Sequence, residues 1–369
     1  MENKIALNQG IIFSAYTTYP NHSLLIDHGR ISGIVASDQI PNDYKVIDVG
    51  GSYICPGLID LQIYGTGDVL FSSSLSGESI SSIEYQLLKQ GCTSFYLTLA
   101  TNTMAVFKKA IDVFNATSTQ VALGLHLEGP FLNPKKRGAH PEELIIKATE
   151  EIINDLLSDA GDAVKMMTIA PELMPAATMA QLISKGILLS AGHSAVTSAE
   201  ANGLYDRGIK TVTHLWNAMS PLHHRDTGLP GVALLDPRLH ASIIVDGIHV
   251  DYDAVRISKQ MMGERLFLIT DAVAACDEGI YPHVFAKDHY TLPDGTLSGS
   301  ALTMLQAIAN CVTKVGISLD ESIRMATLYP AGVIGREDIG NLHEGSVANV
   351  LVFNADFEVQ DVYFQGKKV

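Results

Sequence analysis

The sequence lacks an excess of basic residues. Its 369 residues include 25 Lys and Arg against 40 Asp and Glu, which gives a formal net charge of -15 at pH 7. No Lys- or Arg-rich stretch offsets this charge, so a polyanionic backbone would be repelled. We therefore expect no nucleic-acid partner. Any anionic ligand has to be small and held by a few local donors.

Cysteine is scarce, and no long apolar run is present. The four cysteines form no Cys-x-x-Cys pair, so neither a thiolate zinc site nor a disulfide scaffold is indicated. No apolar run approaches the roughly 20 residues that cross a membrane. The first ten residues, MENKIALNQG, also lack the pattern of a signal peptide. The sequence predicts a cytoplasmic protein with no membrane partner.

The middle of the chain alternates strand-like apolar runs with helix-like segments. The eight runs span residues 53–62, 93–99, 121–128, 164–170, 187–193, 209–214, 241–249 and 266–271. Helices are expected at residues 80–89, 142–157, 179–185 and 252–262. Eight such repeats, with continuous apolar strands, predict a (β/α)8 TIM-type barrel. An open doubly wound sheet is the alternative, disfavoured because no Gly-rich phosphate fingerprint follows the first strand.

Both ends of the chain have a different sequence pattern. Residues 4–49 and 348–369 carry short apolar runs separated by turn residues, which is typical of antiparallel β structure. Because chain termini commonly lie close together, we expect one small β-sandwich built from residues 1–52 plus 340–369, around a barrel at 53–339. Residues 274–300 interrupt the barrel pattern and predict a hairpin over its mouth. Two further helices are expected at residues 302–314 and 320–328.

Two histidines define the most informative stretch, residues 186–228. The apolar runs 187–189 and 209–212 are each followed closely by a histidine, and an amphipathic segment of helical length separates them. This pattern predicts a β-α-β unit. In parallel α/β folds the carboxyl ends of the strands build the site, so His193 and His214 should project into one mouth.

The residues that end the predicted strands are mostly of ligand type. They are Gln62, Glu128, His193, His214, His249 and Asp271. A carboxylate with two neutral imidazoles is a three-ligand set for a divalent metal, with zinc the first choice and iron the second. Taken singly, a histidine at a strand end is more often hydrogen-bonded structure than a ligand, and an Asp there is often a helix cap. Their convergence on one face favours a metal site.

Neighbouring residues leave some alternatives open. His126 shares a strand face with Glu128 and competes with it as a ligand, although Glu128 lies nearer the mouth. Asp271 follows the last barrel strand and suits a base that later acts as an acid. His223 and His224 follow Pro221 in a loop and are expected to be solvated.

Longer motifs point to a family. The chain contains, in this order, PGLIDLQIYG, LHLEGPFLN, AGHS, THLWNAMSPLHHR, DGIHVD, LITDA and DGTLSGSALTM. Together they closely resemble the N-acetylglucosamine-6-phosphate deacetylases of the amidohydrolase superfamily, along nearly the whole chain. The resemblance implies a metal-dependent TIM-type barrel with a β-sandwich made from both termini. It also implies hydrolysis of the acetamide of N-acetyl-D-glucosamine 6-phosphate to D-glucosamine 6-phosphate and acetate.

The same resemblance assigns roles to individual residues. Glu128, His193 and His214 are implied as metal ligands, and Asp271 and His140 as catalytic groups. Arg225 is implied to reach the neighbouring site of a homodimer. The implied substrate contacts are Ala139, His140, Asn217, Ala218, Arg225, His249, Leu297, Ser298 and Gly299.

Two positions depart from common patterns. Many amidohydrolases carry His-x-His on the first strand and bind two metals, whereas Gln62 stands here, so one metal per subunit is expected. Trp216 replaces a common Tyr and is expected to affect at most the pocket wall. Two alternatives to the predicted function stay open. One is deacetylation of N-acetyl-D-galactosamine 6-phosphate, and the other is an inactive binding protein, which the intact ligand set disfavours.

Overall fold

The computed structural model describes residues 4–277 and 279–369, which form two compact units. The described residues of one unit are 4–60, Tyr85–Ser94 and Thr303–Val369. The other comprises Leu61–Glu84 and Phe95–Leu302. The predicted boundaries at 52/53 and 339/340 stay a prediction.

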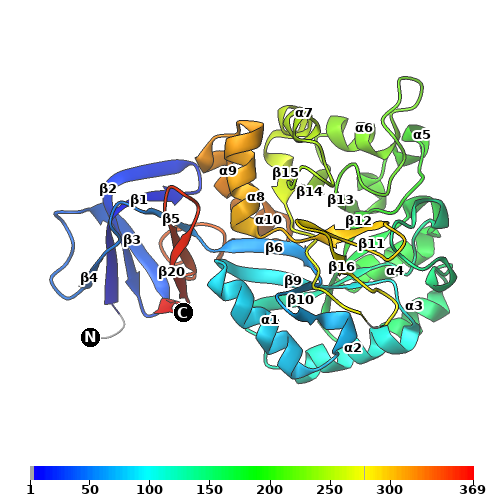
Figure 1. Ribbon diagram of the computed structural model, residues 1–369, viewed down its shortest axis with the longest axis horizontal. Helices are drawn as coiled ribbons and strands as arrows, with labels where there is room; N and C mark the ends of the chain where they lie inside the picture. Colours follow the sequence, from blue (N-terminus) through cyan, green and yellow to red (C-terminus); the bar gives the residue numbers. More distant parts are fainter. Residues whose placement is uncertain (1–3, 278) are drawn as a thin grey trace. The chain divides into compact units, whose positions relative to one another are not determined.

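Eight strands form the barrel sheet (Figure 1), and the fold class predicted from the sequence is confirmed. In sheet order they are β6 (Leu58–Ile63), β9 (Cys92–Ala100), β10 (Ala122–Glu128), β11 (Val164–Ile169), β12 (Leu188–Ala191), β13 (Ile209–Val212), β14 (His240–Ile243) and β15 (Leu266–Leu268). From β9 to β15 every pairing is parallel. A parallel bridge between Ile63 and Ala272 joins the two ends of the sheet. The barrel therefore closes beside β6, just after β15.

Helices lie outside these strands (Figure 1). They are α1 (Gly77–Lys89), α2 (Met104–Ala116), α3 (Glu150–Leu156), α4 (Ala176–Ser184), α5 (Ser198–Ala201), α6 (Gly228–Leu235) and α7 (Tyr252–Met262). The helix predicted at 252–262 is confirmed as α7, and those at 80–89 and 179–185 fall largely within α1 and α4. The helix at 142–157 is wrong in its first half. A 3-10 helix, Glu142–Leu144, stands there instead, and no helix continues through residues 145–149, where Ile146 donates its backbone N–H to the carbonyl of Pro130.

The amphipathic helix predicted between the two histidines is also wrong in length. The link holds only the four-residue α5, capped by Thr197 and Glu200, and the 3-10 helix Tyr205–Arg207. Gly203 and Gly208 then adopt φ of 80° and 88°, which a right-handed helix cannot contain. The link from β12 to β13 is therefore mostly loop.

Both termini build one separate sheet, as predicted. Its order is β21 (Lys367–Lys368), β20 (Val359–Phe364), β19 (Val350–Phe353), β5 (Tyr53–Pro56), β1 (Lys4–Ser14), β2 (Thr17–Asp27) and β3 (Arg30–Ala36), with β4 (Lys45–Asp48) on β1. Its core is aliphatic and includes Leu7, Ile12, Leu24 and Val350. The pairing is not wholly antiparallel, because β1 meets β4 and β5 in parallel.

The strand predicted at 53–62 is in fact two strands that break at Gly57. A Cβ on Gly57 would lie 2.1 Å from Thr93 Oγ1, so only glycine fits this crossing. The unit with the terminal sheet also holds α8 (Met304–Asn310), the π-helix Cys311–Val315, α9 (Leu319–Met325) and α10 (Leu328–Val333).

The predicted hairpin at 274–300 is present as a small antiparallel sheet. Its strands are β16 (Val284–Phe285), β17 (His289–Thr291) and β18 (Leu297–Ser300). Residue 278 of this segment lies outside the described residues. A second hairpin, β7 (Gly65–Thr66) with β8 (Val69–Leu70), directly follows β6. Among the described residues, no helix is long and apolar enough to cross a membrane.

Candidate active site

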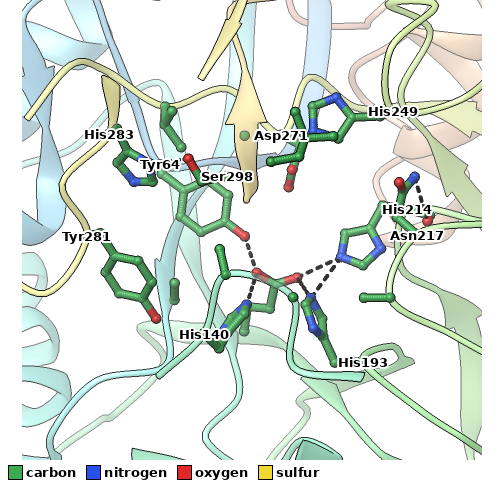
Figure 2. Close-up of a pocket in the computed structure, with 18 of the residues that line it drawn as sticks. Tyr64, His140, His193, His214, Asn217, His249, Asp271, Tyr281, His283 and Ser298 are labelled. Atoms are coloured by element: carbon green, nitrogen blue, oxygen red, sulfur yellow. Dashed lines mark hydrogen bonds and ion pairs between the residues drawn. The ribbon is translucent and has the colours of Figure 1, made fainter. Parts of the chain in front are cut away.

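Three predicted site residues lie just beyond strand ends, in an unusual backbone conformation. His193, His214 and Asp271 follow β12, β13 and β15 by two or three residues. Their φ angles are 51°, 32° and 54°. Side chains other than glycine rarely adopt this left-handed region, and such strain is concentrated at functional sites. Figure 2 shows all three side chains lining one pocket.

Three ligand-type atoms form a close triangle at the barrel mouth. Glu128 Oε1 lies 3.0 Å from His214 Nε2 and 3.3 Å from His193 Nε2. The two imidazole nitrogens are 3.2 Å apart. Ligand atoms held about 2.05 Å from a tetrahedral zinc ion lie about 3.3 Å from one another. The triangle therefore has the dimensions of a three-residue metal site.

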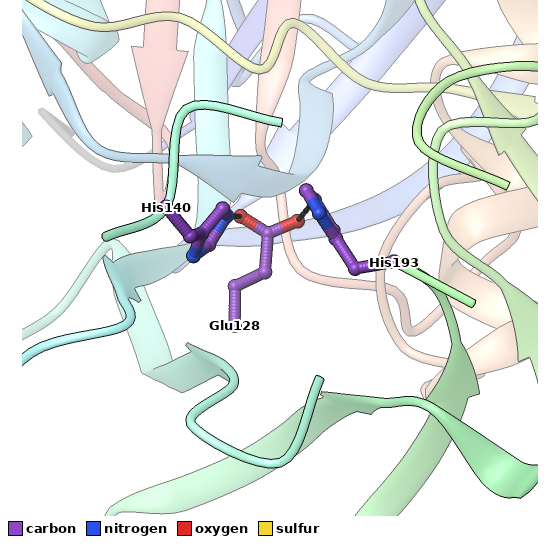
Figure 3. A group of neighbouring side chains, drawn as sticks. All are labelled: Glu128, His140 and His193. Atoms are coloured by element: carbon purple, nitrogen blue, oxygen red, sulfur yellow. Dashed lines mark ion pairs between the residues drawn. The ribbon is translucent and has the colours of Figure 1, made fainter. Parts of the chain in front are cut away.

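The second carboxylate oxygen of Glu128 faces the other way (Figure 3). Glu128 Oε2 lies 3.3 Å from His140 Nε2 and accepts a hydrogen bond from the hydroxyl of Tyr64. Glu128, His140 and His193 are buried and offer ligand atoms within 4.8 Å of one another, so this group could also hold a metal ion. Whether His140 can serve as a ligand depends on which of its ring nitrogens carries the proton.

Hydrogen bonds at Nδ1 assign the protons of His140 and His193. The backbone N–H of Thr101 donates to His140 Nδ1 at 3.3 Å, so a neutral His140 carries its proton on Nε2. His193 shows the reverse arrangement. Its Nδ1 donates to the carbonyl of Lys136 at 2.9 Å, which leaves a lone pair on Nε2. His140 is thus a donor toward the pocket, whereas His193 is ready to bind a metal.

Electrostatics keep the carboxylate charged and His193 neutral. Burial by itself would raise the pKa of Glu128, but the surrounding imidazoles, His193 before His140 and His214, hold it well below its usual range. Burial lowers the pKa of His193, and the nearby His140 adds to this effect. Metal ligation requires these charge states, an ionised carboxylate and a neutral imidazole.

Gln62 joins the two carboxylates of the site. Its Nε2 lies 3.0 Å from Glu128 Oε1, 2.8 Å from Asp271 Oδ1 and 3.0 Å from Tyr64 Oη. The side chain is buried at the point of barrel closure. An amide NH2 group donates hydrogen bonds and cannot bind a metal. The space between Glu128 and Asp271 is therefore occupied by a donor.

His249 reaches the pocket from a loop. The strand end predicted at this position is wrong, because β14 already stops at Ile243. Instead, Asp246 accepts the backbone N–H of His249 and its Nδ1–H, at 2.8 and 2.5 Å. The pKa of Asp246 is lowered despite its burial, because His249 bonds to it. The Asp-Gly-Ile-His spacing thus turns the imidazole of His249 inward.

All but one of the predicted site residues line a single cavity of about 790 Å³, part of which is open to solvent. The predicted residues that line it are Glu128, Ala139, His140, His193, His214, Asn217, Ala218, His249, Asp271, Leu297, Ser298 and Gly299. Arg225 is the exception and lies on an exposed loop. Among the described residues that line this cavity, none is Lys or Arg.

The loop that carries Ala139 and His140 passes close to His193 at Gly138. Gly138 has a φ of 56°, and a Cβ there would lie 3.3 Å from His193 Cε1. A larger residue would therefore crowd His193 from the side of the loop that carries Ala139 and His140.

The sequence reasoning missed several lining residues, among them three with titratable side chains, Tyr64, Tyr281 and His283. Tyr64 lies two positions after Gln62, so the strand period of two could have found it. Tyr281 and His283 lie on the 274–300 segment, where no periodic pattern gave a signal. Burial raises the pKa of Tyr64 and Tyr281 well above the usual range, and it lowers the pKa of His283 to about 4. All three stay uncharged near neutral pH.

Two further residues are positioned away from the cavity. His126 is buried in the barrel, where its Nδ1 donates to the carbonyl of Leu61 and its Nε2 lies 2.8 Å from Thr168 Oγ1. It therefore does not compete with Glu128. Trp216 donates its indole N–H to Ser258 of α7 at 2.9 Å and is not among the lining residues.

This barrel, with a Glu-His-His group that could bind a metal, defines a class of metal-dependent hydrolases. The amidohydrolase family model matches residues 53–369, and the chain belongs to this family. An N-acetylglucosamine-6-phosphate deacetylase from Haemophilus influenzae is 35% identical to it, with 99% of each chain covered.

Solved structures agree with this relationship. The crystal structure of N-acetylglucosamine-6-phosphate deacetylase from Pasteurella multocida matches with a TM-score of 0.94 and 34% identity, over 99% of both chains. A mutant of the Mycobacterium smegmatis enzyme in complex with N-acetyl-D-glucosamine-6-phosphate matches with a TM-score of 0.91 and 26% identity, also over 99% of both chains. The resemblance stated from the motifs is confirmed.

Proposed function

We propose that this chain hydrolyses the acetamide of N-acetyl-D-glucosamine 6-phosphate to D-glucosamine 6-phosphate and acetate. One observation carries the proposal. The triangle of Glu128, His193 and His214 faces the same cavity as Asp271, in a chain whose full-length relatives are named for this reaction. A catalytically inactive binding protein of the same fold would have no need to keep these three ligand-type atoms at the spacing of a metal site.

In this proposal Glu128, through Oε1, and His193 and His214, through Nε2, would hold the metal. The 3.0–3.3 Å spacing of these atoms and the free lone pair of His193 support this set. The protonated Nε2 of His140 argues against His140 as a ligand. When bound, one divalent ion, zinc before iron, would supply Lewis-acid polarisation of the amide carbonyl.

The remaining chemistry falls to two side chains. His140 Nε2–H donates a hydrogen bond to the carbonyl oxygen, where negative charge develops. Asp271 accepts a proton as water adds to the carbonyl carbon, and then delivers that proton to the nitrogen as the C–N bond breaks. Proton transfers therefore balance with one carboxylate serving both half-steps. The amide of Gln62 orients that carboxylate at 2.8 Å.

Recognition of the 6-phosphate is assigned to His249, Asn217, Ala218 and an Arg225 supplied by a neighbouring subunit. The lining residues of the cavity include no Lys or Arg, so a phosphate dianion needs a cation from elsewhere. Exposed apolar side chains on the loop that carries Arg225 and on α6 and α7 support a homodimer. They are Leu222, Leu235 of α6, and Ile257 and Met261 of α7, where α6 and α7 contact each other. The N-acetyl end is assigned to Ala139 and to Leu297, Ser298 and Gly299 of β18.

Acetate release tests the proposal directly. Purified protein is assayed with the 6-phosphates of N-acetyl-D-glucosamine and N-acetyl-D-galactosamine, and its metal content is measured on the same sample. We expect release from the gluco substrate, dependent on metal. Release from neither sugar phosphate by metal-loaded protein would overturn the function, and a preference for the galacto substrate would correct the substrate. A cytoplasmic location stays a prediction.

A further inference from the structure

Tyr64 lines the cavity, but the proposed reaction gives its hydroxyl group no role. Its hydroxyl donates to Glu128 Oε2, the oxygen that faces away from His193 and His214. The residue is buried, and neither the sequence nor the proposed reaction assigns it a role. From this arrangement we infer that Tyr64 is a positioning residue, which holds Glu128 so that a metal meets Oε1 alone.

The two oxygens of Glu128 have separate partners. Oε1 lies within 3.3 Å of both ligand imidazoles, whereas Oε2 is engaged by Tyr64 and by His140 Nε2. A carboxylate free to rotate can bind a metal through both oxygens. Donors on the distal oxygen oppose this rotation, and such partners orient metal ligands in general. Tyr64 therefore fixes which atom of Glu128 is presented.

Tyr64 is fixed through its backbone, its ring and its hydroxyl group. The backbone N–H of Tyr64 donates to the carbonyl of Ala272 at 2.9 Å, and its carbonyl accepts from Phe71 at 3.0 Å. The ring packs against a small cluster with Leu70, Val273 and Ala274. Gln62 Nε2 approaches the hydroxyl oxygen at 3.0 Å, which leaves the hydroxyl proton for Glu128. A side chain fixed in this way can position another.

A close turn brings the phenol to this place. The hairpin of β7 and β8 returns the chain directly onto Tyr64, since Gly65 pairs with Leu70. A Cβ on Gly65 would lie 2.2 Å from the carbonyl oxygen of Val69, so glycine is required there. The hydroxyl reaches Glu128 because the barrel closure and this hairpin fix both ends of the residue.

The test compares Tyr64→Phe with wild type and with the control Tyr290→Phe. Tyr290 packs against the same apolar cluster, but its hydroxyl is bonded to the backbone of Ala275 and not to Glu128. Zinc affinity is measured on metal-free protein by competition with a chelator, and the visible spectrum of the cobalt form reports coordination. The phenyl ring keeps the shape of the phenol, so metal-free melting temperatures should be similar.

This inference rests on the proposed metal site, and the outcomes separate the two. We expect Tyr64→Phe to bind zinc about 10- to 100-fold more weakly, with an altered cobalt spectrum, the size typical of lost ligand-orienting bonds. Tyr290→Phe should match wild type. Equal affinity and equal spectra for Tyr64→Phe and wild type would overturn the role of Tyr64 alone. Absence of tight metal binding in wild type would overturn the metal site as well.

Discussion

Gln62 Nε2 lies 2.8 Å from Asp271 Oδ1, at the point where the barrel sheet closes. The same nitrogen lies 3.0 Å from Glu128 Oε1. A neutral donor therefore sits between the two carboxylates of the site, where a cation bridging them would have to lie. The barrel closure through Ile63 and Ala272 holds both partners in register.

One metal per chain is the first expected outcome of this arrangement. His193→Ala and His214→Ala should each abolish both the bound metal and acetate release, because two protein ligands hold a divalent ion poorly. Metal analysis of the purified variants checks this. His28→Ala, an exposed histidine, is the control and should keep one equivalent. Two tightly bound equivalents in the untreated protein would contradict the single-site arrangement.

Asp271→Asn separates catalysis from binding. The amide keeps the shape of the side chain but cannot shuttle a proton, so kcat should fall roughly 100-fold or more, as for loss of general acid-base catalysis. Metal content and KM should change little, because Asp271 is not one of the three ligand atoms in the triangle. Steady-state kinetics together with metal analysis provide the measurement. Turnover at the wild-type rate would remove Asp271 from the mechanism.

Arg225→Ala should weaken recognition of the phosphate. We expect KM for the phosphorylated sugar to rise about 10- to 100-fold, since a charged hydrogen bond is worth about 1.5 to 3 kcal/mol. The unphosphorylated sugar, assayed in parallel, should be affected little. An equal loss for both sugars would contradict a phosphate role.

Mixed dimers test whether Arg225 acts across subunits. Combining Arg225→Ala chains with Asp271→Asn chains creates heterodimers in which one site carries both wild-type residues. At substrate concentrations well below the KM of Arg225→Ala, activity should therefore rise on mixing if the arginine acts in trans. Confirmed subunit exchange without recovered activity would show that Arg225 acts within its own chain or not at all.

His126 should make stability fall in mild acid. Burial lowers the pKa of His126 to about 4, whereas the unfolded chain titrates near 6.5. The unfolded state thus takes up a proton that the folded state refuses, so this contribution is present above pH 6.5 and is lost as the pH falls toward 4. Between pH 7 and pH 5 the loss from His126 is about 2 kcal/mol. Urea unfolding of the metal-free protein at both pH values measures it.

The variant His126→Gln is the matched comparison. An amide can still bond to Leu61 and Thr168 but does not titrate, so the drop between pH 7 and pH 5 should be smaller by about 2 kcal/mol. Other buried histidines, such as His283, should leave a residual drop in both proteins. An identical pH dependence for the two proteins would show that His126 is not the neutral buried group described.

The sequence by itself determined the barrel, the sheet built from both termini and most of the cavity lining. Continuous apolar runs, such as those of β10 and β11, indicate strands that are buried in a parallel sheet. The topology of such a sheet places the residues after these strands at one mouth of the barrel. Period and composition also placed α7 correctly. They failed at residues 142–149 and in the length of the helix between His193 and His214, because backbone contacts such as that of Ile146 with Pro130 depend on chain segments distant in sequence.

Only the tertiary structure decided which atoms of the site residues contact one another. Spacing marked Glu128 and His193 but could not tell which carboxylate oxygen faces which imidazole. The separate tasks of His140 and His193 follow from their Nδ1 partners, Thr101 and Lys136, which lie 39 and 57 residues away in sequence. Tyr64 gained its contact with Glu128 from barrel closure. Hydrogen-bond direction depends on atoms brought together by folding, and no local pattern encodes it.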